Sequence, residues 1–215
     1  MSRKAIVSKN QIIQAAFDIA KVSGKNSITI RGIGTMLGIS TAPIYTQYKS
    51  IDAIMEDLIT FVNSKVHEST LKERSINAFL NLGVGYLDFV IENTIIFNDF
   101  FLTMGNSILD SNIDNDLYLE QVKKNPFMSD FSNDQLKSIL YDMSVYTYGL
   151  AAMICTKTDV KHELRHYQDM LEKTGNKLIS YHLYSSGKYE SVINKILDEF
   201  SKHIDIREVL KLWEY

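Results

Sequence analysis

The chain has 215 residues, of which 45% are hydrophobic, so it can bury a large core as one long domain or two small ones. Two prolines and ten glycines argue against a loop-rich β architecture, and long uninterrupted stretches of helix-forming residues favour an all-α fold. A single cysteine, Cys155, excludes an internal disulfide and suits a reducing cytoplasm. No signal peptide or membrane-spanning segment is expected, because no stretch is apolar for long enough.

Charge is distributed unevenly along the chain. Residues 1–50 contain seven cationic residues and one aspartate, whereas the whole chain has a net charge of −3. The remainder is therefore strongly acidic. A small basic region on an acidic body is typical of a nucleic-acid-binding head, although solvated surface lysines alone would give the same count.

Residues 29–49 predict two short helices joined by a tight turn. Thr29 can cap the first helix with its hydroxyl, and apolar residues follow at the spacing of one helix face. Gly38 stands where this face ends, and glycine readily takes the left-handed conformation that terminates a helix. Ser40 offers a second N-cap. The outward residues of the second helix carry no charge and are Thr41, Ala42, Pro43, Tyr45, Thr46 and Gln47. The pattern predicts a helix-turn-helix whose second helix lies in a DNA major groove.

These residues resemble the signature of the TetR family of transcriptional regulators. The resemblance rests on Leu37-Gly38-Ile39-Ser40, Ile44-Tyr45, Gln47-Tyr48-Lys49 and Ile54. It covers residues 8–62 strongly and is only architectural beyond them. Family members often have histidine where Gln47 stands and a phosphate-binding lysine where Ile51 stands, so the backbone contact is expected to differ here.

The resemblance implies how the head contacts DNA. Thr41, Ala42 and Pro43 are placed for base edges, and Arg31 matches a position that contacts a base or a phosphate. Tyr45, Thr46, Gln47, Lys49 and Thr29 are expected to hold phosphates, and Arg3, Lys4 and Lys9 to form a basic arm. The predicted DNA-binding residues are Thr29, Arg31, Ser40, Thr41, Ala42, Pro43, Tyr45, Thr46, Gln47, Tyr48 and Lys49.

We predict two domains, a helix-turn-helix DNA-binding domain at 1–50 and a helical ligand-binding and dimerisation domain at 51–215. A long helix from Ser50 to about His67 joins them. Further helices are expected at 71–92, 94–110, 114–123, 132–156, 160–184, 188–202 and 205–213. Ser132 and Gln135 form a predicted capping box at one of these helices.

Aromatic and methionine residues are dense in the first half of the body. Such side chains either fill the core or line a cavity for a flat apolar ligand. In this family the body typically binds the inducer, so we predict that some of them line a pocket. The candidate ligand-binding residues are Tyr86, Phe89, Phe97, Phe101, Met104, Tyr118, Phe127, Phe131, Tyr141 and Tyr148.

The resemblance further implies a homodimer formed by the helices near 132–156 and 160–184, where Val145, Gly149 and Met153 share a face. A twofold dimer reads a palindromic operator. The predicted function is thus a repressor that a small apolar or aromatic molecule releases from DNA, without catalysis or cofactor. A constitutive DNA-binding protein whose body only dimerises is the first alternative.

A second alternative comes from His162-Glu163-Leu164-Arg165-His166, which matches the H-E-x-x-H zinc hydrolase string. On a helix its histidines lie four residues apart, on one face. Catalytic zinc needs a third ligand and a walled cleft, and Arg165 places a cation within the string. A solvated helix start is the favoured interpretation, and we predict no metal site.

Overall fold

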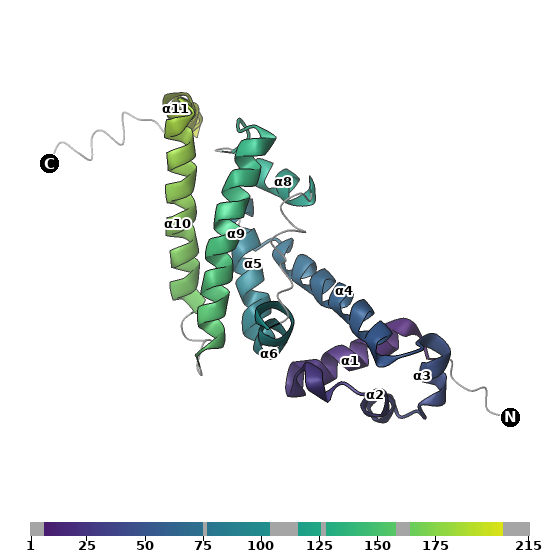
Figure 1. Cartoon of the computed structure of the whole chain (residues 1–215). Coiled ribbons are helices and arrows are strands. Elements are labelled where there is room, and N and C mark those ends of the chain that lie inside the picture. The colour runs from purple at the N-terminus through teal and green to yellow at the C-terminus, as the bar shows by residue number, and fades with distance from the viewer. Residues whose placement is uncertain (1–6, 75–76, 104–115, 126–127, 158–163, 204–215) are drawn as a thin grey trace.

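The computed structural model describes residues 7–74, 77–103, 116–125, 128–157 and 164–203. Within these ranges the chain is helical and contains no strand, which confirms the predicted all-α class. A small N-terminal group of helices and a larger body lie at opposite ends of one long connecting helix (Figure 1). We refer to residues 7–49 as the head and to the helices from α5 (Ala78–Glu92) onward as the body.

The head consists of short helices with clear end signals. They are α1 (Lys9–Ser23), the 3-10 turn η1 (Lys25–Ser27), α2 (Ile30–Leu37) and α3 (Ala42–Gln47). Ser8 caps α1: its hydroxyl accepts from the Gln11 N–H at 3.2 Å, and the Gln11 side chain accepts from the Ser8 N–H at 2.9 Å. The buried face of α1 contacts α2 and α4 and forms the core of the head.

The connecting helix α4 (Ile51–Thr70) belongs to both parts of the molecule. Ser50 caps it by accepting from the Ala53 N–H at 3.3 Å. Its buried residues recur every four positions along one side, so a single stripe packs first on α1 and then on α5. The buried stripe is Ile54, Leu58, Val62, Val66 and Thr70.

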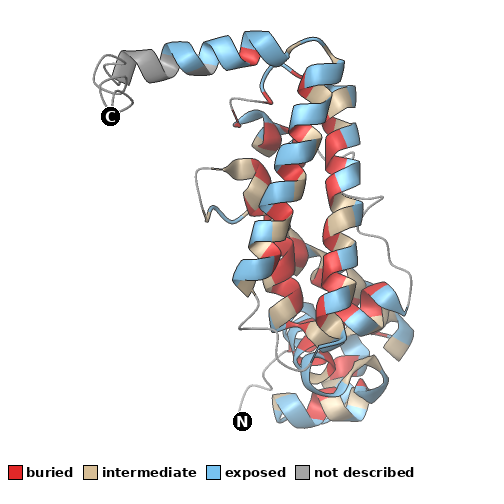
Figure 2. Cartoon of the chain, turned by 90° about the vertical axis from the view of Figure 1, so that its left-hand side faces the viewer, coloured by how far each residue is buried: buried red, intermediate tan, exposed pale blue. Residues whose placement is uncertain are grey.

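The body is a bundle of helices around an aromatic core. Its elements are α5 (Ala78–Glu92), α6 (Thr94–Phe97), the π-helix η2 (Asn98–Leu102), α8 (Asp116–Lys123), α9 (Asn133–Cys155), α10 (Leu164–Ser185) and α11 (Tyr189–His203). The long helices α9 and α10 run side by side and turn their buried faces toward α5, whereas α11 extends away from the pair (Figure 2). The capping box of Ser132 and Gln135 at the start of α9 is present.

Two predicted helix spans were wrong in detail. Helix α5 begins at Ala78 rather than near residue 71, because α4 continues to Thr70 and a turn follows. The helix expected from residue 94 is divided into α6 and a π-helical turn, in which Thr103 N–H bonds to Asn98 O at 2.9 Å. The expected helix at 205–213 lies outside the described residues.

Among the described residues, no single helix is both long and apolar enough to cross a membrane. Within the described part of the chain, α5 taken together with Thr94–Leu102 does reach that length and composition, but the two segments are bent by 103° at the break between them.

Candidate nucleic-acid interface

The turn between α2 and α3 is built from backbone contacts that need small residues. Thr29 caps α2 by accepting from the Gly32 N–H at 2.9 Å. Gly38 has a φ of +65°, the left-handed conformation expected at a helix end, and the next N–H, of Ile39, donates to Gly34 O at 2.9 Å. A Cβ added at Gly34 would lie 3.0 Å from Ile39 O, so this turn approaches α2 closely.

Buried side chains on both sides of the turn fix the angle of α3. Ile33 and Ile44 are fully buried, and Tyr48 is only 4% exposed. The Tyr48 hydroxyl donates to Asp57 Oδ2 at 2.7 Å and so ties the end of α3 to α4. Burial, helped by the Asp57 carboxylate, raises the pKa of Tyr48, which keeps this donor protonated.

Tyr48 therefore departs from the prediction that it contacts DNA. It is a core residue that positions α3, and the Lys9 ammonium lies 4.7 Å from its ring centroid. Ser40 also departs from its predicted role as N-cap, because α3 begins at Ala42 and Thr41 occupies the cap without a side-chain hydrogen bond. Ser40 remains exposed beside the helix start.

The other predicted DNA-binding residues reach the surface of the head. Tyr45 is 56% exposed, and Thr41, Pro43 and Gln47 are half-buried. The remaining exposed ones are Thr29, Arg31, Ala42, Thr46 and Lys49. The outward face of α3 is thus uncharged and is followed by the exposed Lys49, an arrangement suited to base edges in the groove and phosphates at its rim.

Cations of the head differ in what they contact. Lys9 pairs with Asp57 at 3.6 Å, with both side chains about half exposed, whereas Arg31, on α2, and Lys49, just after α3, are exposed. Lys25 turns toward the body, where its ammonium donates to the Asp99 carbonyl oxygen at 3.2 Å. Arg3 and Lys4 of the predicted basic arm lie outside the described residues.

This arrangement of helices occurs in a known regulator. A crystal structure of a TetR-family transcriptional regulator from Streptomyces coelicolor matches the chain with a TM-score of 0.69 and 14% sequence identity, covering 99% of this chain and 100% of the other. The chain has the TetR-family fold. The resemblance predicted from residues 8–62 is thereby confirmed at the level of the fold.

A weaker match exists at the level of sequence. The uncharacterised HTH-type transcriptional regulator YobS of Bacillus subtilis (strain 168) is 25% identical over 97 residues, which are 43% of this chain. The match spans 51%, about half, of the length of that relative. No family model matches the chain.

The body of this TetR-type fold contains a cavity between α4, α5, α8, α9 and α10, with a volume of about 90 Å³. Most of its wall is apolar, and no lysine, arginine or histidine lines it among the described residues. The lining residues are Thr70, Asn77, Phe79, Leu80, Leu82, Gly83, Tyr86, Tyr118, Leu140, Met143, Ser144, Thr147, Leu171, Glu172, Gly175 and Asn176.

One side of the cavity carries a hydrogen-bonded cluster. The Tyr118 hydroxyl lies 2.9 Å from Thr70 Oγ1 and 2.9 Å from His67 Nδ1, and the His67 ring stacks on the Tyr118 ring with centroids 5.1 Å apart. Burial lowers the pKa of His67, so its neutral form is favoured in this contact. The cluster fixes Tyr118 on α8 against the end of α4.

The predicted pocket residues fall into different places. Tyr86 and Tyr118 line the cavity. Phe89, Phe97, Phe101 and Phe131 are buried elsewhere in the core, and Tyr148 packs on Phe97 with centroids 5.5 Å apart. Tyr141 is 51% exposed on α9 and does not line this cavity. Met104 and Phe127 lie outside the described residues.

Sequence reasoning missed the aliphatic walls of the cavity, such as Leu140, Met143 and Leu171. Their helical spacing predicts that they lie on the inner faces of helices, but it does not show where packing between those faces leaves a cavity. For the zinc string, His162 and Glu163 lie outside the described residues, and His166 is exposed at the start of α10.

Proposed function

We propose that the protein is a sequence-specific DNA-binding transcriptional regulator, and not an enzyme. The observation that carries the proposal is the exposed, uncharged face of α3, which the buried residues Ile44 and Tyr48 hold in place and which the exposed Lys49 follows. A helix presented in this way fits the major groove with its N-terminal residues toward base edges. A location in the cytoplasm, where such a protein meets DNA, belongs to the same proposal.

The side chains divide into two roles. Thr41, Ala42 and Pro43 read bases at the start of α3, where the apolar surfaces of Ala42 and Pro43 suit thymine methyl groups. Thr29, Tyr45, Thr46, Gln47 and Lys49 bind phosphates and set the register, and Arg31 contacts a base or a phosphate.

A homodimer is proposed on the outer face of α9 and α10. Val145 and Met153 are 48% and 51% exposed on α9, and Gly149 between them has open space where a Cβ would point. On α10, Tyr181 and Tyr184 are 65% and 79% exposed. An apolar stripe with a glycine at its centre suits the close approach of the same stripe from a second copy. Twofold symmetry then places two α3 helices on a palindromic operator.

The cavity in the body is the proposed effector site, and it favours a ligand-responsive regulator over a constitutive DNA-binding protein. A wall of phenylalanine, leucine and methionine suits an apolar or aromatic molecule. Burying an anion there is unfavourable because no cation lines the cavity among the described residues. The volume of about 90 Å³ is smaller than the ~150 Å³ of an engineered cavity that binds benzene. A ligand as large as benzene, or larger, must therefore widen the cavity.

Ligand binding is proposed to lower operator affinity by moving α4, since Thr70 lines the cavity at the end of this helix. The ligand must prefer the state that does not bind DNA, by about 5.5 kcal/mol for a nearly complete switch. In this scheme the protein represses transcription when it is bound to the operator, and ligand binding relieves the repression.

The test is binding to the DNA upstream of the protein's own gene, measured by fluorescence anisotropy at two salt concentrations and against random DNA. A preference of roughly 10³-fold or more over random DNA is expected for a specific regulator. Equal, steeply salt-dependent binding to that DNA and to a library of genomic fragments would contradict sequence-specific recognition.

A further inference from the structure

One residue in the wall of the body cavity has a polar atom without a hydrogen-bond partner. Tyr86, on α5, lines the cavity and is only 9% exposed. Its hydroxyl is buried and makes no hydrogen bond within the described part of the chain, whereas most buried polar atoms in folded proteins are bonded. Leaving a buried donor unpaired costs free energy of folding. An unpaired donor in the wall of a binding cavity is therefore a candidate contact for the ligand.

The other buried polar side chains of this wall are bonded within the chain. The Tyr118 hydroxyl lies 2.9 Å from Thr70 Oγ1. Thr147 Oγ1 donates to the carbonyl oxygen of Met143 at 2.7 Å. A ligand would have to compete with these existing bonds, whereas a bond to Tyr86 replaces none that the described residues make.

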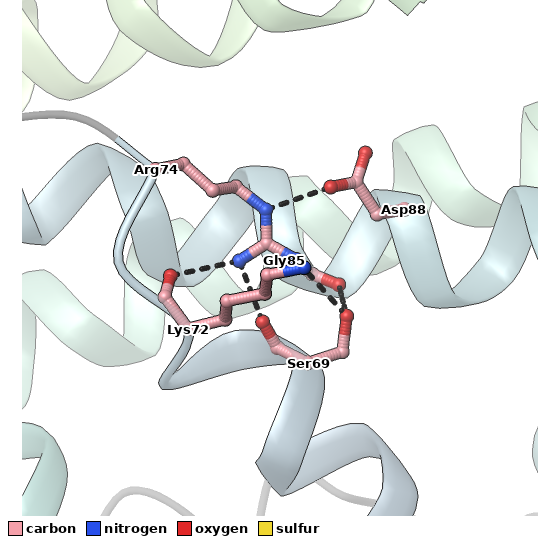
Figure 3. A network of polar contacts seen from close by, with 5 residues as sticks. All are labelled: Ser69, Lys72, Arg74, Gly85 and Asp88. Atoms are coloured by element: carbon pink, nitrogen blue, oxygen red, sulfur yellow. Dashed lines mark hydrogen bonds and ion pairs between the residues drawn. The ribbon is translucent and has the colours of Figure 1, made fainter.

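Neighbouring contacts fix the position of Tyr86. Its ring meets Phe97 edge to face, with centroids 6.1 Å apart. The preceding residue, Gly85, packs on the end of α4, where the Ser69 hydroxyl donates to Gly85 O at 2.8 Å and a Cβ on Gly85 would lie 2.3 Å from Ser69 O. Arg74 Nη1 donates to the same Ser69 carbonyl oxygen at 2.7 Å (Figure 3). A donor held in this way loses little conformational freedom when it binds a ligand.

The charges around the cavity favour a neutral ligand. Burial raises the pKa of Tyr86, so its hydroxyl stays protonated and can donate. No cation lines the cavity among the described residues, and the exposed Glu172 on α10 would repel an anion. A cation bound beside the buried Tyr86 would lose its hydration without gaining a buried counter-ion. A neutral carbonyl oxygen can accept from the hydroxyl and brings no charge into the cavity.

We propose that Tyr86 selects the effector by donating a hydrogen bond to a neutral carbonyl oxygen on an otherwise apolar molecule. The apolar part of the ligand lies against the aliphatic and aromatic walls. Because a ligand as large as benzene must widen the cavity, the bond to the buried hydroxyl forms as the walls move apart. The inference rests on the proposed function, since the cavity is the proposed effector site, and it narrows the ligand class to small apolar carbonyl compounds.

The test compares two probes, cyclopentanone and methylenecyclopentane, which share one ring and differ only in an oxygen or a CH₂ group on the double bond. Binding to the full-length protein is followed by NMR with ¹³C-labelled methionine methyl groups. Met143 lines the cavity and is the reporter, whereas the signal of Met36, exposed on α2 in the head, should not move. Tyr86→Phe is expected to weaken cyclopentanone binding roughly three- to tenfold and to leave the affinity for methylenecyclopentane unchanged.

Tyr118→Phe is the matched control, because it removes a hydroxyl from the same cavity that is already bonded to Thr70. It should change the affinities for both probes by the same factor. Urea unfolding without a probe gives a second, independent measurement. The midpoint should stay the same or rise in Tyr86→Phe, which removes an unpaired group, and should fall in Tyr118→Phe, which removes a bonded one.

Equal losses of affinity for the two probes in Tyr86→Phe would overturn the inference. A fall of its urea midpoint as large as that of Tyr118→Phe would also overturn it, because the Tyr86 hydroxyl would then have a partner in the free protein. So would a Met143 signal that does not respond to cyclopentanone in the parent protein. Since no DNA is present, failure of this contact and failure of the proposed DNA binding are distinguished.

Discussion

The head and the body solve different problems with the same kind of secondary structure. In the head, the helices are short, their ends are marked by caps and by Gly38, and the buried residues that fix α3 come from adjacent segments. In the body, the helices are long, and buried aromatic residues meet across positions far apart in the chain, such as Phe97 and Tyr148.

The difference teaches what each region has to preserve. B-DNA presents a nearly constant groove, so the head must hold one rigid outward face on α3. A cavity, by contrast, exists only where packing is incomplete, and its walls come from α4, α5, α8, α9 and α10 together. Replacing one wall residue alters the cavity while the bundle persists, whereas replacing a buried residue of the head alters the face itself.

The largest expected effect concerns the core of the head. Ile44→Ala removes a fully buried side chain and should cost about 2–5 kcal/mol of the free energy of unfolding. Urea denaturation followed by circular dichroism measures this loss, and DNA binding should fall with it. Met36→Ala, at a residue 49% exposed on α2, is the control and should cost about 0.5 kcal/mol or less. A similarly small cost for Ile44→Ala would contradict the view that the buried residues of the head hold α3 in place.

A change on the outer face of the body should separate the subunits and leave the head folded. Val145→Glu places a charge in the proposed dimer interface, and the dimer dissociation constant should rise about 100-fold or more. Sedimentation equilibrium measures it. Val22→Glu makes the same substitution at a residue 76% exposed on α1, and this variant should remain dimeric. A dimer unaffected by Val145→Glu would place the interface elsewhere.

The junction between the end of α4 and α5 depends on Arg74. Arg74→Lys keeps the charge but loses the planar guanidinium that binds Asp88 and two carbonyl oxygens. The free energy of unfolding should therefore fall by about 1–3 kcal/mol. Thermal unfolding measures the change. Lys72→Ala, which removes an exposed side chain from the same turn, should have little effect. Equal melting temperatures for Arg74→Lys and the parent protein would mean that packing alone holds α4 against α5.

The smallest expected effect lies on the DNA-facing surface. Tyr45→Ala removes a side chain that is 56% exposed, so stability should be unchanged, while DNA affinity should fall roughly tenfold through loss of a phosphate contact. Anisotropy with the DNA upstream of the gene measures the affinity. Tyr189→Ala, at a residue 44% exposed on α11, is the control for losing an exposed tyrosine. Unchanged affinity in Tyr45→Ala would contradict the docking of α3.

Most helix ends of the head could be predicted from the sequence because local interactions determine them. Ser8, Thr29, Ser50 and Gly38 stand where their hydrogen bonds or backbone conformations mark helix ends, and these signals act over three or four residues. Tyr48 was misassigned because position in a signature does not show which way a side chain points. Its hydroxyl instead donates to Asp57, which lies on the next helix.

The body shows what the sequence by itself could not determine. Helical periodicity determined that the body is all-α, and capping determined where α9 begins. It did not determine that Tyr141 faces outward, that Tyr86 borders a cavity, or that Asp99 reaches Lys25 across the molecule. Those facts depend on how helices are rotated and spaced against each other. That geometry results from the packing of all side chains at once, so only the tertiary structure decides it.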